Sequence, residues 1–126
     1  MRHVMKLGTD IIEINRVEKA IHKSRAFLKR VYTEAEIEYC EGKGKSRFYS
    51  YAGIYAAKEA ILKALGTGLR YGSWQDVEIN HNELGAPIVI MKGAFADRLK
   101  MMNSKDVIIS ISHCKDYAMS TAIIEE

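Results

Sequence analysis

The sequence is poor in proline and cysteine and has no long apolar run. It holds one proline and two cysteines in 126 residues, and no apolar run approaches the roughly 18 residues that a membrane span needs. The N-terminal segment MRHVMKLGTD lacks the apolar core of a signal peptide. Cys40 and Cys114 cannot build a disulfide framework, and neither belongs to a CxxC pair. We therefore expect a cytoplasmic protein with two free thiols and no membrane partner.

The chain also lacks a large excess of either charge. Its 19 Lys and Arg residues against 16 Asp and Glu residues leave a net charge of +3 at pH 7, which is too small to predict a nucleic-acid-binding protein. Basic residues do gather locally, between Arg16 and Arg30 and again at Lys43, Lys45 and Arg47. These segments are either ordinary solvated surface or a contact surface for an acidic protein or a phosphorylated ligand.

The spacing of apolar residues predicts helices mixed with antiparallel strands. The chain has no internal repeat, low-complexity segment or linker-like change in composition, so we expect a single domain over residues 1–126. The expected elements are a strand over 3–13 that ends near Asp10, helices over 15–31, 33–40, 46–66 and 94–102, and hairpin strands over 77–80, 88–92, 107–112 and 117–124. This order is typical of an α+β fold, a single compact domain with an antiparallel sheet and a long central helix.

Three helix starts carry capping residues. Asn15 followed by Glu18 is typical of a capping box, and so is Thr33 followed by Glu36. Ser46 can cap the alanine-rich helix, which we expect to be mostly buried and to end at a glycine stop.

Two carboxylates stand in apolar surroundings. Asp10 lies in a strand that we expect to bury Leu7 and Ile11, and Glu59 lies among the alanines of the long helix. Each has a structural explanation, because Asp10 can accept backbone hydrogen bonds at a strand end and Glu59 can form a surface salt bridge with Lys63. Together they are two hard oxygen ligands from different elements, which favours a Mg²⁺ site completed by water and ligand phosphate.

The segment KEAILKALGTG extends this candidate site. Lys63 brings positive charge within one turn of Glu59, and the backbone of Gly66, Thr67 and Gly68 can approach a ligand closely. The spacing is not that of a Walker motif, and a glycine after a helix can equally be a C-cap without a ligand.

The segment SISHCKD puts Ser112 and His113 at the mouth of the closing hairpin. His113 is either a general base, a phosphate-facing cation or a structural hydrogen-bonding group. A nucleophilic pair of His113 with Cys114 is disfavoured, because neighbours along a strand point to opposite faces.

These segments carry a family resemblance. In one register across nearly the whole chain, GTDIIEINR, AAKEAILKALGTG, WQDVEI, GAP and ISHCKDYA resemble the holo-acyl-carrier-protein synthase family of 4'-phosphopantetheinyl transferases. The resemblance implies the fold of that family and a Mg²⁺-dependent transfer of 4'-phosphopantetheine from coenzyme A to a serine of an apo acyl carrier protein, leaving adenosine 3',5'-bisphosphate. It also implies a homotrimer with active sites between neighbouring subunits.

The resemblance also assigns site residues. It places metal ligands at Asp10 and Glu59, and coenzyme A contacts at Lys63, Gly66, Thr67, Gly68, Pro87, Ser112 and His113. Catalysis would then depend on Asp10, Glu59, Lys63 and His113, because attack on a pyrophosphate needs its charge neutralised. The serine proton passes to Asp10, to Glu59 or to a water on the metal, and the residues do not rank these acceptors.

A basic stripe is the expected docking surface for an acidic carrier protein. Arg16, Lys19, Lys23 and Arg30, with Phe27 among them, fall opposite the apolar side of the first helix. A merely solvated face is the alternative, and the resemblance favours docking because the family uses the position of Arg16.

One position departs from the family pattern. Where members commonly read AGRFAAKEA, this chain reads AGIYAAKEA, so Ile54 stands at an arginine position. The helical spacing from Ile61 favours a core role for Ile54. The change removes a charge-assisted phosphate contact of roughly 1.5–3 kcal/mol, unless Lys45, Arg47 or Lys58 supplies the charge.

Two other functions stay open. A small basic module that binds RNA or an acidic protein without catalysis would explain the basic stripe, but it leaves Asp10 and Glu59 unexplained. A transferase that acts on polyketide or peptide-synthetase carriers instead of a fatty-acid carrier would have the same residues.

Overall fold

The computed structural model describes residues 5–104 and 106–125. Its elements are β1 (Met5–Glu13), α1 (Ile14–Lys23), α2 (Arg25–Val31), α3 (Glu34–Glu41), the 3-10 turn η1 (Gly44–Ser46), α4 (Arg47–Leu65), the 3-10 turn η2 (Trp74–Asp76), β2 (Val77–His81), β3 (Pro87–Met91), α5 (Gly93–Met101), β4 (Val107–His113) and β5 (Tyr117–Glu125). The expected α+β class, with antiparallel strands and a long central helix, is confirmed.

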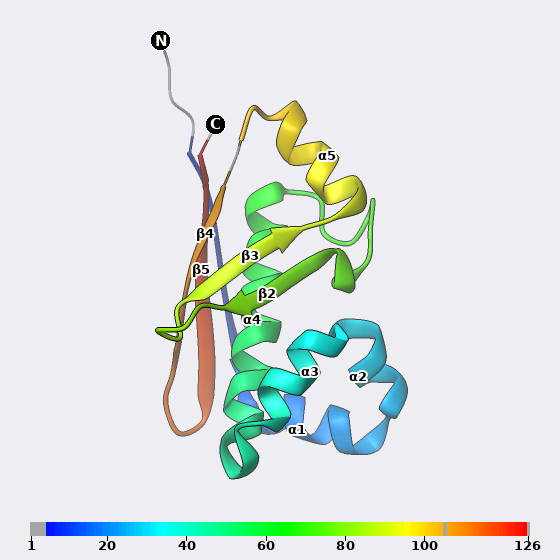
Figure 1. Cartoon of the computed structure of the whole chain (residues 1–126), viewed down its shortest axis with the longest axis vertical. Helices are drawn as coiled ribbons and strands as arrows, with labels where there is room; N and C mark the ends of the chain where they lie inside the picture. The colour runs from blue at the N-terminus through cyan, green and yellow to red at the C-terminus, as the bar shows by residue number, and fades with distance from the viewer. Residues whose placement is uncertain (1–4, 105, 126) are drawn as a thin grey trace.

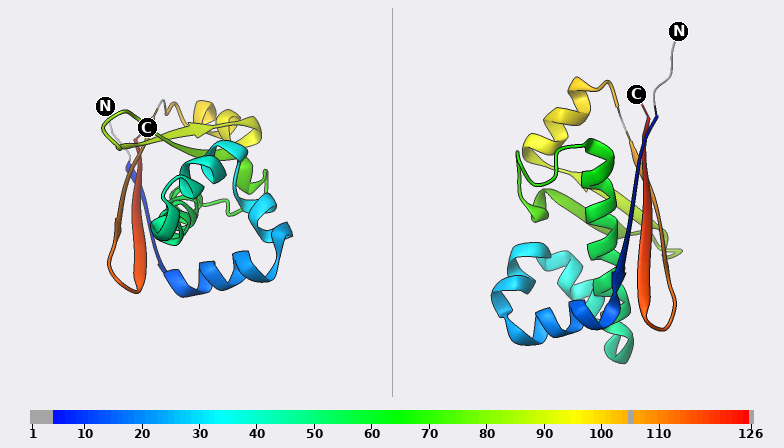
Figure 2. Two further views of the ribbon diagram at one scale, coloured as in Figure 1. Left: turned by 60° about the horizontal axis from the view of Figure 1, so that its bottom comes forward. Right: turned by 180° about the vertical axis from the view of Figure 1, so that it is seen from behind.

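The elements form layers around α4 (Figure 1). A three-stranded antiparallel sheet in the order β1-β5-β4 covers one side of this helix. The β2–β3 hairpin, α5 and the run of helices α1 to α3 surround the rest of it, as the two views of Figure 2 show. Because α4 is enclosed in this way, most of its side chains belong to the core.

The sheet and α4 approach each other closely at Gly8 of β1. A Cβ atom at this position would lie 2.0 Å from the carbonyl oxygen of Ala60 and 2.7 Å from the backbone nitrogen of Ala64. The backbones of β1 and α4 therefore touch, which requires glycine on one side and small residues on the other. Since alternate strand residues share a face, this contact also turns Asp10 toward α4.

The strand prediction for β1 was partly wrong. Residues 3 and 4 lie outside the described residues, and the strand continues past Asp10 to Glu13. Leu7 and Ile11, which were expected to be buried, have 64% and 66% of their surface exposed. The reason is the two-residue period of a strand, because the face that holds Gly8 must be the inner one.

The first helix was also predicted incorrectly. It begins at Ile14 after Glu13, so Asn15 lies inside it, and its start has no side-chain cap. It then breaks at Ser24, whose extended backbone ends α1 and whose Oγ accepts a hydrogen bond from the backbone nitrogen of Phe27 at 3.4 Å. Serine competes with the helix for backbone hydrogen bonds in this way. The basic stripe is therefore divided between α1 and α2.

The next two helices follow the prediction more closely. Thr33 and Glu36 form the expected capping box of α3. Ser46 precedes α4 as expected but makes no capping hydrogen bond with its side chain. Gly66 ends α4 in the left-handed conformation, with φ at 77°. Cys40 and Cys114 are free thiols, as predicted.

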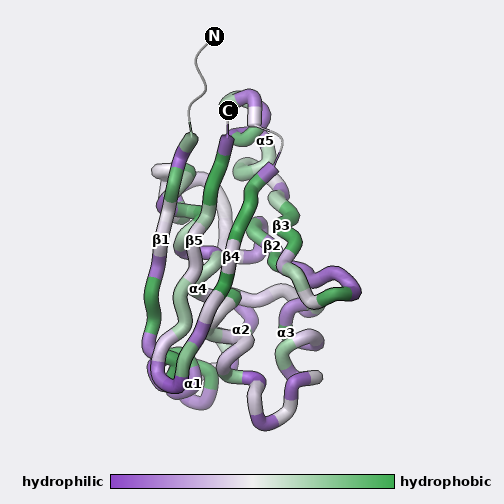
Figure 3. The backbone as a smooth tube through the Cα atoms, turned by 90° about the vertical axis from the view of Figure 1, so that its left-hand side faces the viewer, coloured by the Kyte–Doolittle hydropathy of each residue, from purple (hydrophilic) through white to green (hydrophobic). Residues whose placement is uncertain are grey.

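The outer face of the three-stranded sheet is rich in exposed apolar side chains. Figure 3 looks at the sheet from the side away from α4 and shows apolar segments in all three strands. The large exposed residues of these strands are Met5, Leu7, Ile11, Ile108, Tyr117 and Met119. An apolar patch that extends over several strands is unusual for the free surface of a monomer. None of the described helices is long and apolar enough to cross a bilayer.

Candidate active site

Asp10, Glu59 and Lys63 gather where β1 crosses the second half of α4. The Nζ atom of Lys63 donates to the carbonyl oxygen of Thr9 at 3.0 Å and to Oδ1 of Asp10 at 3.1 Å. Glu59 lies one helical turn before Lys63. Within the described residues Lys63 forms its ion pair with Asp10, and no ion pair joins it to Glu59. The predicted alternative, a surface salt bridge between Glu59 and Lys63, therefore does not form. The lysine instead ties the strand to the helix.

The two carboxylates of this cluster repel each other. Burial raises the pKa of Glu59 above its usual value, and the charge of Asp10 raises it further, while Lys63 opposes both effects. A cation between the carboxylates would relieve this repulsion. In the part of the chain that the structure describes, no group of three or more His, Cys, Asp or Glu side chains is placed to hold a metal. Asp10 and Glu59 supply two carboxylates, and Mg²⁺ commonly takes one or two carboxylates from a protein and keeps several waters.

Tyr55 is a member of this neighbourhood that the sequence analysis missed. Burial raises its pKa, and so do the charges of Glu59 and Asp10, while Arg16 lowers it. Tyr55 also lines a small cavity of about 130 Å³ with Arg16 and Phe27. The sequence could have indicated Tyr55, because it stands four residues before Glu59 and the two side chains therefore lie on one side of α4.

The basic stripe borders this cluster. Arg16, Lys19 and Lys23 are exposed on α1, and Arg30 is exposed on α2. Phe27 is half-buried, with its ring centroid 6.2 Å from that of Tyr55. Phe27 is therefore a packing residue with one exposed side, and the carboxylate cluster and the basic surface lie on the same side of the molecule.

The glycine segment follows directly after Lys63. Gly66 and Gly68 both have positive φ angles, of 77° and 57°, which favour glycine. Thr67 between them is 6% exposed, and its Oγ1 donates to the carbonyl oxygen of Gly68 at 2.9 Å. Gly66 is a C-cap, and the chain turns here beside the lysine.

Pro87 and His113 belong to a second cluster at a different place. They line a cavity of about 250 Å³ with Tyr39, Tyr49, Ser50, Gly53, Ile54, His81, Gly85 and Ile111, which we name the imidazole cavity. The His113 ring stacks on Tyr49 with a centroid distance of 4.9 Å. Ser112 precedes His113 on β4 and is exposed, and neighbouring strand residues point to opposite faces.

One chain does not bring the two clusters together. Asp10 is on β1 and His113 is on β4, at opposite edges of a sheet with β5 between them. Two strand spacings separate these edges by roughly 10 Å before any offset along the strands. The expected site residues thus form two half-sites, the carboxylate cluster and the imidazole cavity.

Ile54 stands where the family commonly has an arginine, and Lys45, Arg47 and Lys58 were the residues expected to supply the missing charge. Ile54 is 1% exposed and packs in the core, as its spacing predicted. Lys58 is fully buried and pairs with Glu36 at 2.7 Å, so the suggestion that it supplies a ligand charge was wrong. Arg47 donates to the carbonyl oxygen of Gly44 at 3.1 Å. The exposed Lys45 keeps its charge available.

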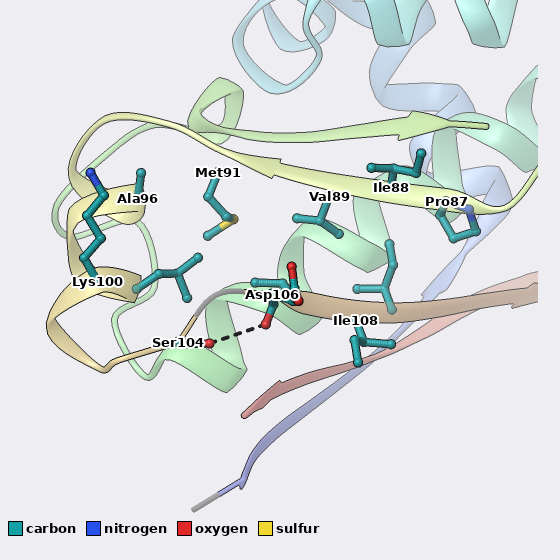
Figure 4. Close-up of a pocket in the computed structure, with 12 residues that line it drawn as sticks. Pro87, Ile88, Val89, Met91, Ala96, Lys100, Ser104, Asp106 and Ile108 are labelled. Atoms are coloured by element: carbon teal, nitrogen blue, oxygen red, sulfur yellow. Dashed lines mark hydrogen bonds between the residues drawn. The ribbon is translucent and has the colours of Figure 1, made fainter. Parts of the chain in front are cut away.

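A third hollow is a groove of about 490 Å³ between β3, α5 and β4. Figure 4 shows its aliphatic walls, with Lys100 at one end and the hydrogen bond from Ser104 Oγ to the carbonyl oxygen of Asp106, at 3.4 Å. Pro87 lies between this groove and the imidazole cavity and lines both. The carboxylate cluster has no part in it.

Comparisons with known proteins agree over almost the whole chain. Residues 6–122 match the family model described as the 4'-phosphopantetheinyl transferase superfamily. A holo-[acyl-carrier-protein] synthase of Caldanaerobacter subterraneus is 46% identical over 93% of this chain and 91% of its own. The enzyme of that name from Clostridium tetani is 44% identical over 97% of this chain and 96% of its own.

Solved structures extend these matches to the fold. The holo-(acyl-carrier-protein) synthase of Bacillus anthracis in complex with CoA (3',5'-ADP) superposes with a TM-score of 0.81 at 35% identity, over 99% of both chains. The Helicobacter pylori enzyme in complex with coenzyme A has a TM-score of 0.81 at 31% identity, over 94% of this chain and 98% of its own.

Proposed function

The chain belongs to the 4'-phosphopantetheinyl transferase superfamily, and we propose that it converts an apo acyl carrier protein to its holo form. The carrier's serine oxygen attacks the phosphorus that bears the pantetheine arm of coenzyme A. The bond to the second phosphate breaks, and adenosine 3',5'-bisphosphate leaves. The observation that carries this proposal is the match to holo-acyl-carrier-protein synthases along nearly the full length of both chains. That match, over residues 6–122 in the family model, also supports one transferase domain over residues 1–126.

Asp10 and Glu59 would hold Mg²⁺ in this enzyme. The support is chemical, because burial and the charge of Asp10 raise the pKa of Glu59, and a cation beside the two carboxylates would relieve this. When bound, the ion would neutralise the phosphate charge that develops during transfer. The serine proton would pass to one of these carboxylates or to water.

Lys63 has two roles in the proposal. It orients Asp10 through its hydrogen bond to Oδ1, and its side chain is 55% exposed, so it can also reach a phosphate oxygen. The backbone that follows it at Gly66, Thr67 and Gly68 would lie along the ligand. His113 and Pro87 would contact coenzyme A from the second half-site, and Ser112 would contact it from the other face of β4.

A homotrimer would unite the two half-sites. The exposed apolar face of the β1-β5-β4 sheet supports self-association. Because the carboxylate cluster and the imidazole cavity lie at opposite edges of this sheet, a ring of identical subunits would place the first of one subunit beside the second of its neighbour. Each active site would then lie between subunits.

The carrier protein would dock on the basic stripe. Arg16, Lys19, Lys23 and Arg30 give α1 and α2 a positive surface next to the carboxylate cluster, with Phe27 as its half-buried apolar centre. Acidic carriers suit such a surface, and exposed charges of this kind speed association more than they tighten it. We place the reaction in the cytoplasm, as part of fatty-acid biosynthesis.

The test is direct. The protein is incubated with coenzyme A, Mg²⁺ and an apo acyl carrier protein, and the products are weighed by mass spectrometry. We expect the carrier to gain one 4'-phosphopantetheine group and adenosine 3',5'-bisphosphate to appear in equal amount. Omitting Mg²⁺ with a chelator present should stop both. An unmodified set of fatty-acid, polyketide and peptide-synthetase carriers would overturn the proposal and return the chain to a non-catalytic binding module.

A further inference from the structure

Tyr55 has a hydroxyl group that neither the fold nor the proposed reaction uses. Two buried tyrosines use theirs within the chain, because Tyr32 donates to the carbonyl oxygen of Tyr51 at 2.7 Å and Tyr51 donates to Oε2 of Glu41 at 2.6 Å. No described residue forms a hydrogen bond with the hydroxyl of Tyr55, which is half-buried. In the family pattern AGRFAAKEA the matching residue is phenylalanine. The ring therefore fits the common pattern, and the hydroxyl is an addition to it.

The ring of Tyr55 is held in place on both sides. It stacks on Trp74 with a centroid distance of 5.3 Å and an interplanar angle of 26°, and its centroid lies 6.2 Å from that of Phe27. The backbone of Trp74 is fixed in turn, because its carbonyl oxygen accepts a hydrogen bond from Nζ of the buried Lys58 at 3.1 Å. A ring that is already held loses little conformational freedom when its hydroxyl binds a partner. The hydroxyl is thus suited to contact a second molecule.

Tyr55 lies near both the carboxylate cluster and the basic stripe. Burial raises its pKa, and the charges of Glu59 and Asp10 raise it further. The charges of Arg16 and Arg30 lower it. Tyr55 and Arg16 also line the same cavity of about 130 Å³. The phenol therefore stands where a protein docked on the basic stripe would come closest to the carboxylates.

Tyr55 also begins a row of side chains along α4. Because Tyr55, Glu59 and Lys63 are four residues apart, they lie on one side of the helix over about 12 Å. In the proposed reaction the donor's phosphate lies at the Lys63 end, beside the glycine segment, and the metal lies at Glu59. The attacking and leaving oxygens must be roughly in line. A carrier docked on the basic stripe then brings its serine to the phosphorus past Tyr55.

We propose that the hydroxyl of Tyr55 donates a hydrogen bond to Oγ of the carrier's serine and holds this oxygen for attack. The inference rests on the proposed function, because it assumes a carrier docked on the basic stripe. A phenol is protonated at neutral pH and can donate, so the serine's own proton stays free to pass to a carboxylate or to water. No bond to Tyr55 forms or breaks, and its role is to position the nucleophile.

The test is a cycle between one hydroxyl of the enzyme and one of the carrier. Calorimetry measures the binding of two apo acyl carrier proteins, one with its serine and one with alanine in its place, without coenzyme A so that no transfer occurs. The variant is Tyr55→Phe, which keeps the ring. We expect it to bind the serine carrier roughly three- to tenfold more weakly than the wild type does and to bind the alanine carrier equally well. In transfer assays kcat/KM for the carrier should fall by a similar factor, with KM for coenzyme A unchanged.

The matched control is Tyr71→Phe. Tyr71 has 53% of its surface exposed and belongs to neither the basic stripe nor the carboxylate cluster. The control should bind both carriers as the wild type does. An equal loss for both carriers in Tyr55→Phe would show a structural role or a contact elsewhere on the carrier and overturn the proposal, as would no loss for either.

A measurement on the wild type covers the case in which Tyr55→Phe does not fold. The NMR signals of the Tyr55 ring should differ between the complexes with the serine carrier and with the alanine carrier, while those of Tyr71 should be the same in both. Identical Tyr55 signals in the two complexes would overturn the proposal. If the wild type modifies a carrier without this difference, the inference fails alone. If it neither binds nor modifies any carrier, the proposed function fails.

Discussion

Helix α4 carries two lysines that each pair with a carboxylate, and the two pairs lie in opposite environments. Lys58 meets Glu36 at 2.7 Å with both side chains fully buried. Lys63 meets Asp10 at 3.1 Å with side chains that are 55% and 14% exposed. The residue types and distances are alike, and the lysines are five positions apart in KEAILK. The two pairs differ in how far they are buried and in how many hydrogen bonds surround them.

The inner pair is closed to any further partner. Besides Glu36, the Nζ atom of Lys58 donates to the carbonyl oxygens of Val31, at 2.6 Å, and Trp74, at 3.1 Å. Glu36 also accepts from the backbone nitrogens of Thr33, at 2.8 Å, and Ile79, at 2.8 Å. With its three protons used, the lysine holds the ends of α2, α3 and η2 against α4. A buried pair of this kind is tolerated because its hydrogen bonds are satisfied.

The outer pair is open. Among the described residues Lys63 donates to Thr9 and Asp10 alone, which leaves a third donor direction free. Glu59 beside it has a raised pKa, caused first by burial and then by Asp10. The pair is open to solvent on the lysine side, so Lys63 can rearrange around an ion or a phosphate. The comparison teaches that burial and hydrogen-bond saturation, rather than residue type, separate a structural pair from a candidate catalytic one.

The largest expected effect is on the inner pair. Replacing Lys58 by Met should destabilise the protein by about 3–5 kcal/mol, because Glu36 keeps a buried charge without its partner. Urea denaturation followed by Trp74 fluorescence measures this. The double variant Lys58→Met with Glu36→Gln should recover part of the loss. A change below about 1 kcal/mol in Lys58→Met would remove the distinction between the pairs.

The next effect is on catalysis in the outer cluster. Asp10→Ala should lower kcat/KM by about a hundredfold or more, since a metal ligand contributes several kcal/mol to transition-state stabilisation. Its unfolding free energy should change by less than about 1 kcal/mol. Asp97→Ala, an exposed carboxylate on α5, is the matched control. Near-normal turnover of Asp10→Ala at saturating coenzyme A and ordinary Mg²⁺ would refute the metal-site proposal.

Replacing Lys63 by Met tests the lysine of the outer pair. It should raise KM for coenzyme A about tenfold, because a charge-assisted hydrogen bond of roughly 1.5–3 kcal/mol is lost. In denaturation experiments it should behave almost as the wild type, in contrast to Lys58→Met. If both lysine variants lost the same stability, the exposed pair would be structural too.

The smallest expected effect is on carrier docking. Arg16→Glu should raise KM for the carrier roughly three- to tenfold and weaken its dependence on salt, because one long-range attraction becomes a repulsion. The kinetic parameters for coenzyme A should stay the same. Lys6→Glu, a charge reversal on β1 outside the basic stripe, is the control. Unaltered carrier kinetics in Arg16→Glu would make the stripe an ordinary solvated surface.

Local signals in the sequence predicted a good part of the fold. The capping box of Thr33 and Glu36, the glycine that ends α4 and both hairpins were found because each depends on residues close together in the chain. The break at Ser24 was missed because the apolar spacing of the two helices continues across it. The reversed faces of Leu7 and Ile11 were missed because both sides of β1 carry apolar residues.

The sequence by itself carried the family resemblance, predicted the long alanine-rich helix and singled out Asp10 and Glu59 as two carboxylates in apolar surroundings, since each of these depends on residues read along the chain. Only the tertiary structure decided that Lys58 is an internal tie and that Asp10 and His113 lie at opposite edges of one sheet. The reason is that burial and strand order arise from contacts between distant segments. Glu36 and Lys58 are 22 residues apart, and Asp10 and Lys63 are 53 apart, far beyond the reach of any helical or strand period.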